Sequence, residues 1–261
     1  MKVLCLHGRE QSSQIFRAQL RVLMEVVASE TEVLYDFVDA PKQCEGRSSS
    51  KAQAVYNFYD AGTIDEIRRA HDWLTDKLTA DGPYDGVIGF CQGATVASSY
   101  LQSFQWQFYQ DQVPFKFAIF IGGSLSLQAI QALGIAIPEA AKTVAKETDS
   151  RRHADLGPSA AHVSLARQAM FNSDDCFGLN LNRIPRELKI RIPTLHVWSA
   201  DDPAFPTSIH LASLCDPYLR KIYTHGGAHE VPQGTENTQK LGELALWCMQ
   251  RATWPGDRQT P

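Results

Sequence analysis

The sequence predicts an α/β fold in which helices flank a mostly parallel central sheet. Short apolar runs alternate with amphipathic helical segments over most of the 261 residues, and this alternation is typical of βαβ units. One such run, residues 85–88, leads into Gly89-Phe90-Cys91-Gln92-Gly93 and then into small residues suited to a helix. Glycine on both sides of a single reactive residue permits a very sharp turn. The pattern therefore predicts a nucleophile elbow, with Cys91 at the N-terminal end of a helix.

Six segments carry the apolar runs that are typical of buried strands in a parallel sheet. The expected strands are residues 2–6, 32–38, 85–88, 115–121, 194–198 and 220–224. The polar stretch 42–51, with three consecutive serines, is expected to form a loop.

Apolar residues recur at helical spacing between these strands. The expected helices are residues 14–28, 63–78, 139–146, 160–170, 208–214 and 235–253, together with the helix that follows the elbow. Thr63 is an expected N-cap because Glu66 stands three residues later, the spacing of a capping box.

The regular alternation lapses between residues 124 and 189, where helical pieces occur without a clear strand. In a parallel-sheet hydrolase such an insertion can lie over the active site. We therefore expect a single domain over residues 1–261, with a helical cap at about residues 124–190. The alternative is a rim of helices far from the chemistry.

The composition excludes several classes of function. Hydrophobic residues make up 44% and charged residues 21%, which is ordinary for a globular protein. The formal net charge of −4 comes without acidic or basic blocks, so neither nucleic acid nor a membrane is an expected partner. No apolar run approaches the ~20 residues needed to span a bilayer, and the N-terminal apolar stretch is too short for a signal peptide. The expected location is the cytoplasm.

The six cysteines are scattered, without a CxxC pair, and we expect free thiols in a reducing compartment. The histidines and cysteines also lack the spacing of a metal site. No metal and no cofactor is therefore expected.

Three residue types in a fixed order point to nucleophilic catalysis. A nucleophile needs a base to accept its proton and a third group to orient that base. Cys91, Asp202 and His229 occur in the order nucleophile, acid, histidine, and each follows an expected strand. All three should therefore meet at the carboxyl edge of the sheet, where open α/β sheets bind ligands. The alternative for Cys91 is a small residue filling the core.

The acid and the base each have a competing neighbour. Asp202 is preferred to Asp201 because Pro203 restricts its backbone, while Asp201 can form the turn. His229 is preferred to His225 because it follows two glycines in a loop that can carry the imidazole over the elbow.

An oxyanion hole and a substrate wall can also be predicted. One backbone N–H should come from Gln92, the residue after the nucleophile, and the other from Arg9 or Glu10 in the loop after the first strand. Four aromatic residues are candidates for substrate contact, with core packing as the alternative for the first two: Tyr56, Phe58, Phe171 and Phe177.

Several longer segments resemble one known family, the FSH family of serine hydrolases, which includes stand-alone thioesterases and hydrolases of fungal polyketide pathways. The similar segments are LCLHG, PYDGVIGFCQGA, KFAIFIGG, IPTLHVWSADDP and HGGAHEVP. The resemblance implies an α/β-hydrolase fold and the hydrolysis of esters or thioesters. By motif it places the nucleophile at Cys91, the acid at Asp202 and the base at His229. The chain departs from the family at Cys91, where the family has serine.

A cysteine nucleophile would change the chemistry. Its thiol has a pKa near 8.5 when free, and a helix N-terminus or an imidazolium favours the thiolate. The acyl-enzyme would be a thioester, matched in energy to an acyl chain on a carrier protein. We expect an acyl thioester or ester hydrolase that releases a polyketide-like chain in secondary metabolism, with a polyketide synthase carrier domain as a partner. The alternatives are an acyltransferase or cyclase on the same scaffold, and a non-catalytic binding protein.

Overall fold

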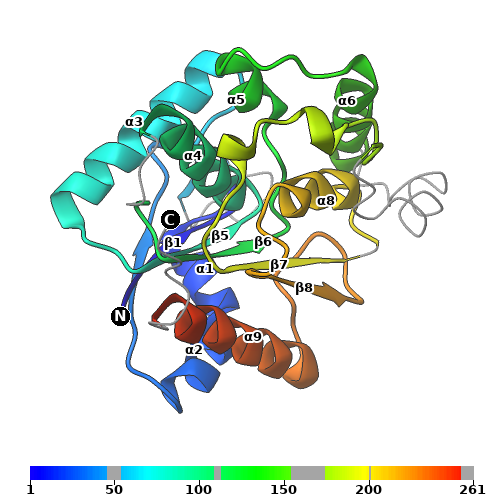
Figure 1. Cartoon of the computed structure of the whole chain (residues 1–261). Helices are drawn as coiled ribbons and strands as arrows, with labels where there is room; N and C mark the ends of the chain where they lie inside the picture. The colour runs from blue at the N-terminus through cyan, green and yellow to red at the C-terminus, as the bar shows by residue number, and fades with distance from the viewer. Residues whose placement is uncertain (46–53, 109–112, 154–173, 200, 254–261) are drawn as a thin grey trace.

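The computed structural model describes residues 1–45, 54–108, 113–153, 174–199 and 201–253. Its centre is a six-stranded parallel sheet with the strand order β2-β1-β5-β6-β7-β8 (Figure 1). The strands are β1 (Lys2–Leu6), β2 (Leu34–Val38), β5 (Gly86–Phe90), β6 (Phe117–Ile121), β7 (Thr194–Ser199) and β8 (Arg220–His225). All six predicted strands are confirmed, with ends that differ by at most two residues.

The burial of the strands explains why they could be recognised in the sequence. Every residue of β5, β6 and β7 is buried, because helices cover both faces of the sheet. The outer strands β2 and β8 are only partly buried. Central parallel strands therefore read as continuous apolar runs.

The helices form two layers, one on each face of the sheet (Figure 1). The first layer contains α1 (Ser13–Gln19), α2 (Arg21–Ala28) and α9 (Thr235–Thr253). The second contains α3 (Ile64–Asp81), α4 (Gln92–Phe108), α5 (Leu127–Ala132), α6 (Glu139–His153) and α8 (Phe205–Ser213).

Successive residues of β1 alternate between the two layers: Val3 and Cys5 join the core beneath α1, α2 and α9, while Leu4 and Leu6 join the core beneath α3 and α4. This is the period-two alternation of a strand that is covered on both faces.

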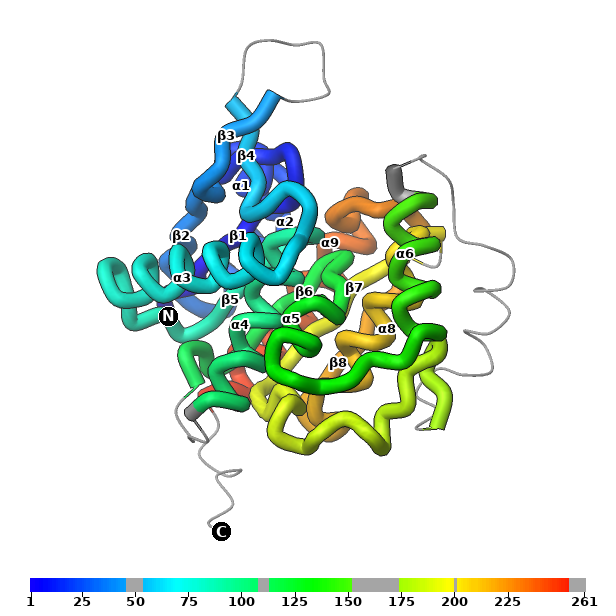
Figure 2. Tube along the Cα trace, turned by 90° about the horizontal axis from the view of Figure 1, so that it is seen from above, coloured from blue at the N-terminus to red at the C-terminus, as the bar shows by residue number. Residues whose placement is uncertain are grey.

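Two sequence predictions were wrong in detail. The expected helix 14–28 is divided at Leu20, whose backbone ends α1 and precedes α2. The expected loop 42–51 contains a short strand, β3 (Lys42–Cys44), which pairs antiparallel with β4 (Val55–Asn57). The polar residues of β3 gave no strand signal because its hairpin lies outside the main sheet, beside α1 (Figure 2).

Other helix predictions hold with adjusted ends. The capping box of α3 is confirmed: Thr63 accepts the Glu66 N–H, and Glu66 accepts the Thr63 N–H. The predicted helix 235–253 is confirmed at both ends. The helix expected at 208–214 begins earlier, at Phe205, because Pro206 fits the first turn of a helix. The helix expected at 160–170 lies outside the described residues.

The segment 124–190 contributes helices and no strand in its described parts, 124–153 and 174–190. Seen from above, α5 lies beside α4 and α6 beside α8 (Figure 2). Two short 3₁₀ helices follow, η1 (Leu181–Arg183) and η2 (Arg186–Leu188), and η2 packs against α4. This segment therefore covers the sheet face on which α4 lies.

Across the described ranges, every helix is too short or too polar to cross a lipid bilayer.

Candidate active site

Cys91 occupies a sharp turn between β5, which ends at Phe90, and α4, which begins at Gln92. Its φ angle is 49°, in the left-handed region that non-glycine residues seldom adopt. Its N–H donates to the Ile121 carbonyl at the end of β6, 2.8 Å away. Only 6% of the residue is exposed. The geometry is that of a strained strand–turn–helix elbow with the thiol-bearing residue at its apex.

The two flanking glycines are required by close backbone packing. A Cβ atom built on Gly89 would lie 2.5 Å from Ala94 Cα. A Cβ atom on Gly93 would collide with the Leu6 carbonyl oxygen and lie 2.6 Å from the His7 carbonyl oxygen. These neighbours are backbone atoms, at the C-terminal end of β1 and in the first turn of α4. They therefore cannot move aside as a side chain could.

Replacing Gly93 by alanine is expected to destabilise the protein by about 2–3 kcal/mol, the usual cost of overpacking. This corresponds to a fall of roughly 5–10 °C in Tm for a chain of this size. Thermal unfolding followed by circular dichroism measures the change. Gly226→Ala is the matched control, because a Cβ at that position meets no atom within 4 Å. Equal Tm values for the two variants would contradict the packing argument.

The acid and the base predicted from the sequence lie together at the carboxyl edge of the sheet. Asp202 follows β7 and His229 follows β8, and His229 Nδ1 is 2.6 Å from Asp202 Oδ2. The other carboxylate oxygen, Asp202 Oδ1, accepts the Ala204 N–H at 2.7 Å. Asp202 is 1% exposed, whereas 21% of the His229 side chain is exposed. The carboxylate is thus fixed beneath an imidazole that faces solvent.

The competing neighbours have other partners. Asp201 is exposed, and its N–H donates to Ser199 Oγ at 3.0 Å. His225 is buried, and its Nδ1 accepts the Gly227 N–H at 3.2 Å. Burial lowers the pKa of His225. Ser199 Oγ also donates to the Gly227 carbonyl, which ties the loop carrying the acid to the loop carrying His229.

His229 also approaches the elbow. Its ring centroid is 5.5 Å from that of Phe90, the residue before Cys91. Gly122 follows Ile121, whose carbonyl accepts the Cys91 N–H. A Cβ atom built on Gly122 would lie 3.0 Å from His229 Cε1. Cys91 and His229 line the same cavity. The structure therefore brings all three residues of the predicted constellation to one place.

The loop after β1 is held by a buried histidine. His7 Nε2 accepts the Ala40 N–H at 3.0 Å, so the ring hydrogen is on Nδ1, which donates to the Gly8 carbonyl at 2.6 Å. Burial lowers the pKa of His7, which keeps the ring neutral. Gly8 lies against the Phe90 ring, since a Cβ there would be 2.7 Å from Phe90 Cδ1. The loop is thereby seated directly on the elbow.

The predicted oxyanion residues Gln92, Arg9 and Glu10 all line the cavity. The Glu10 N–H is engaged: it donates to Asn57 Oδ1 at 2.8 Å, and Glu10 has a left-handed φ of 53°. The Arg9 N–H makes no hydrogen bond to the residues that the structure describes. This contact with Asn57 was not predicted, because a single asparagine at the end of a short strand gives no sequence signal.

The cavity has a volume of about 670 Å³, within the range of sites for small ligands. Four regions of the chain form its wall: the loop after β1, the loop before α3 with the start of that helix, the elbow with its acid and histidine loops, and the segment containing α5 and α6. From this last segment come Ser124, Leu125, Ser126, Leu127, Gln128, Ala145 and Asp149.

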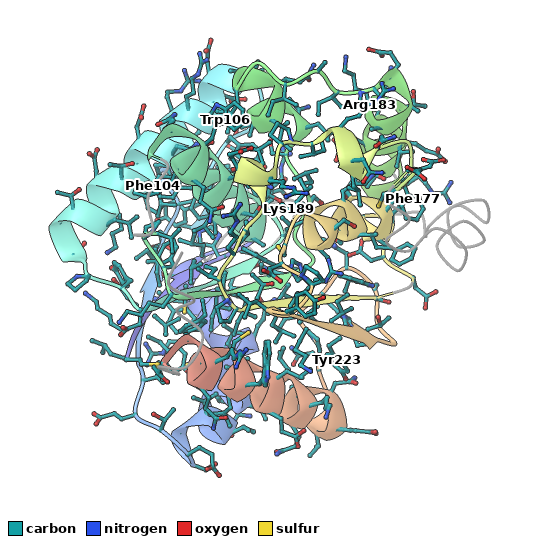
Figure 3. The ribbon with its side chains drawn as sticks, in the orientation of Figure 1. Phe104, Trp106, Phe177, Arg183, Lys189 and Tyr223 are labelled. Atoms are coloured by element: carbon teal, nitrogen blue, oxygen red, sulfur yellow. The ribbon has the colours of Figure 1, made fainter. Side chains whose placement is uncertain are left out.

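The aromatic residues proposed for substrate contact lie elsewhere. Phe58 is buried between His7 and Trp73, with ring centroids 5.4 Å from each. Tyr56 is half-buried on β4. Phe177, which is labelled in Figure 3, packs edge-on against Phe205 of α8.

None of these three residues lines the cavity, and Phe171 lies outside the described residues. Tyr59, the third aromatic residue of the sequence cluster that contains Tyr56 and Phe58, lines the cavity instead.

In the part of the chain that the structure describes, no three histidine, cysteine, aspartate or glutamate residues gather closely enough to hold a metal ion.

Solved structures share this architecture. Arabidopsis thaliana SOBER1 matches with a TM-score of 0.50 and 12% identity, over 95% of this chain and 99% of that one. An esterase/lipase from an uncultured bacterium matches with a TM-score of 0.50 and 16% identity, over 97% and 77% of the two chains. These similarities show the α/β-hydrolase fold.

Sequence comparison gives the family. Esterase FPY3 from Fusarium mangiferae is 24% identical, over 89% of this chain and 89% of its own length. Esterase alnB from Emericella nidulans is 25% identical, over 96% and 97%. The family model described as serine hydrolase (FSH1) matches residues 1–241. The chain therefore belongs to the FSH1 serine hydrolase family.

Proposed function

We propose that this protein hydrolyses acyl esters or thioesters through an acyl-enzyme on Cys91, with His229 as general base and Asp202 as the residue that orients it. The observation that carries the proposal is the 2.6 Å hydrogen bond between His229 and Asp202 beside the strained Cys91. Membership of a hydrolase family and relatives named as esterases support it.

Before substrate binds, the Cys91 proton passes to His229 Nε2 and leaves a thiolate–imidazolium ion pair. Nε2 is the available base because Nδ1 carries the hydrogen donated to Asp202. In the first half of the reaction, the Cys91 thiolate sulfur attacks the acyl carbonyl carbon. The negative charge on the carbonyl oxygen is stabilised by the N–H groups of Gln92 and Arg9. The Glu10 N–H is not assigned, because Asn57 already accepts it.

The tetrahedral intermediate then collapses. The bond to the leaving alkoxide or thiolate breaks, and the imidazolium of His229 protonates the leaving group. The acyl chain remains as a thioester on Cys91. In the second half, His229 removes a proton from water, which attacks the thioester, and the carboxylic acid leaves as the Cys91 thiol is restored.

A thioester intermediate favours a thioester substrate, because one thioester replaces another at little cost. We therefore propose an acyl chain borne on a carrier protein, polyketide-like in kind, as the substrate class. The helices of the segment 124–190 act as a cap in this proposal, supported by the five residues at 124–128, with Ala145 and Asp149, on the cavity wall.

The proposal is tested by mass spectrometry of the intact protein after incubation with a panel of acyl thioesters. A mass gain equal to the acyl group, mapped to Cys91 and lost on further incubation in water, is the expected result. Parallel incubations with an amine measure transfer to acceptors other than water. Acylation of a different residue, or turnover with Cys91 unmodified, would contradict the mechanism.

Cys91 is expected to react with iodoacetamide faster than the other cysteines at neutral pH. Burial raises the pKa of Cys5, Cys44 and Cys248, and that of Cys215 to about 12. A raised pKa leaves little thiolate at pH 7, and thiolate is the reacting form. Peptide mapping after brief labelling at several pH values checks the order.

The pH dependence provides a further control. His229→Ala should move the onset of Cys91 labelling towards that of a free thiol, near pH 8.5, because the imidazolium that favours the thiolate is removed. Cys44 labelling as fast as Cys91, or an unchanged pH profile in His229→Ala, would contradict a preformed ion pair.

A further inference from the structure

We infer that Asn57 is a positioning residue that holds the backbone at Arg9 in place for stabilising the oxyanion. This inference rests on the proposed function. Asn57 is 3% exposed at the end of β4, and its Oδ1 accepts the Glu10 N–H at 2.8 Å. Glu10 is one of three non-glycine residues with a positive φ in the described chain, and it lies at the cavity together with Cys91.

The hydrogen bond to Asn57 fixes the Arg9–Glu10 peptide. Peptide groups are planar, so holding the Glu10 N–H also sets the direction of the Arg9 carbonyl. The preceding peptide is fixed separately, because the Gly8 carbonyl accepts from His7 Nδ1. Both peptides that flank Arg9 are therefore held by buried side chains. The left-handed Glu10 backbone would otherwise relax towards a more common conformation.

Asn57 belongs to a three-residue segment that also holds the other donor. The next residue, Phe58, donates its N–H to Gln92 Oε1 at 2.8 Å, and the Tyr59 carbonyl accepts from Gln92 Nε2 at 2.7 Å. Residues 57–59 thus bind the loop carrying Arg9 on one side and Gln92 on the other. This segment sets the separation between the two proposed oxyanion donors.

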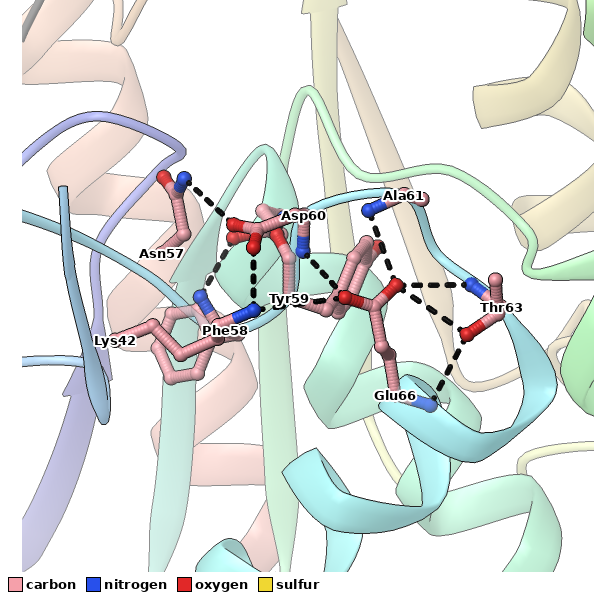
Figure 4. A network of polar contacts seen from close by, with 9 residues as sticks. Lys42, Asn57, Phe58, Tyr59, Asp60, Ala61, Thr63 and Glu66 are labelled. Atoms are coloured by element: carbon pink, nitrogen blue, oxygen red, sulfur yellow. Dashed lines mark hydrogen bonds and ion pairs between the residues drawn. The ribbon is translucent and has the colours of Figure 1, made fainter. Parts of the chain in front are cut away.

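The segment is itself anchored by a network of polar contacts (Figure 4). Asn57 Nδ2 donates to Asp60 Oδ1 at 3.4 Å, and Asp60 forms an ion pair with Lys42. Glu66, at the start of α3, accepts the N–H groups of Asp60 and Ala61 at 3.3 Å and 3.0 Å. These contacts explain how a short loop can hold two donors rigidly, as oxyanion stabilisation requires.

Asn57→Leu tests the inference, because it keeps the branched shape of the side chain and removes the acceptor. Removal of a whole oxyanion donor typically costs on the order of 10²–10³ in kcat. We expect misplacement of one donor to lower kcat by about 10- to 100-fold, with KM changed less than about threefold. Inhibition by a trifluoromethyl ketone, which forms a tetrahedral oxyanion, should weaken by the same factor as kcat/KM falls.

Alkylation of Cys91 by iodoacetamide should proceed at the wild-type rate in Asn57→Leu, because this displacement at carbon forms no oxyanion. Asn57→Asp, which keeps the acceptor oxygen, should retain several-fold more activity than Asn57→Leu. The matched control is Gln43→Leu, which also replaces an amide by leucine, at an exposed position of β3 outside this network and outside the cavity wall; its activity should stay within about twofold of wild type. Asn57→Ala repeats the test if the leucine variant fails to fold.

The outcomes separate this inference from the proposed function. If wild-type protein acylates Cys91 and the folded Asn57→Leu variant does so at the same rate, the positioning role is wrong and the hydrolase mechanism stands. Equal losses in Asn57→Leu and Asn57→Asp, or a slowed alkylation by iodoacetamide, would also overturn it. If wild-type Cys91 is never acylated, the proposed function itself fails, and the role of Asn57 fails with it.

Discussion

Replacing Cys91 by alanine is expected to lower kcat by on the order of 10⁴-fold or more while leaving the fold intact. Removal of the nucleophile from a comparable triad has an effect of about 10⁶-fold, because attack by free water must replace attack by a held side chain. Alanine fits the site, since Cys91 is a small residue at a turn whose geometry depends on Gly89 and Gly93. Hydrolysis of an acyl thioester, measured with a circular dichroism spectrum of each variant, gives the result.

Cys44→Ala is the control for that experiment, because it also removes one thiol but lies on β3, outside the residues that line the cavity. Its activity should match wild type.

Cys91→Ser then reports on the mechanism: retained ester hydrolysis would mean that the base and the oxyanion donors accept oxygen as well as sulfur. Substantial turnover by a folded Cys91→Ala variant would rule out the covalent mechanism.

The central fold could be predicted from the sequence because its strands are buried on both faces. β5, β6 and β7 have no exposed residue, so their apolar runs are unambiguous. The strand β3 was missed because two of its three residues are exposed and its partner, β4, is ten residues away along the chain. The division of the first helix at Leu20 was missed because the apolar spacing continues across it.

The residues with reactive side chains were easier to place than the aromatic residues expected to contact substrate. Cys91, Asp202 and His229 each follow a strand, and parallel strands bring their carboxyl ends to one edge. The aromatic residues carry no such constraint, because periodicity does not tell which neighbour a ring will meet. Phe58 meets His7 and Trp73, and Phe177 meets Phe205. Hydrogen-bonding residues such as Asn57 depend on contacts between distant segments, which a single sequence does not reveal.

The second large effect is expected at the acid and the base, where the chain offers a control beside each residue. His229→Ala should lower kcat/KM by on the order of 10²–10⁴-fold, the usual contribution of general-base catalysis. His225→Ala should have a much smaller effect, because His225 Nδ1 is engaged with the Gly227 N–H and only supports the loop. Steady-state hydrolysis of one acyl thioester by both variants provides the comparison.

The same reasoning applies to the two aspartates. Asp202→Asn keeps the shape of the side chain but replaces the carboxylate that accepts from both His229 Nδ1 and the Ala204 N–H. An amide in its place can favour the wrong tautomer of the imidazole, with its hydrogen on the nitrogen that must act as base. Asp201→Asn changes an exposed side chain whose backbone N–H, not its carboxylate, holds the loop. Only the aspartate that orients His229 should lower kcat/KM by orders of magnitude when it is replaced by asparagine. A larger loss in Asp201→Asn than in Asp202→Asn would therefore mean that Asp201 is the acid.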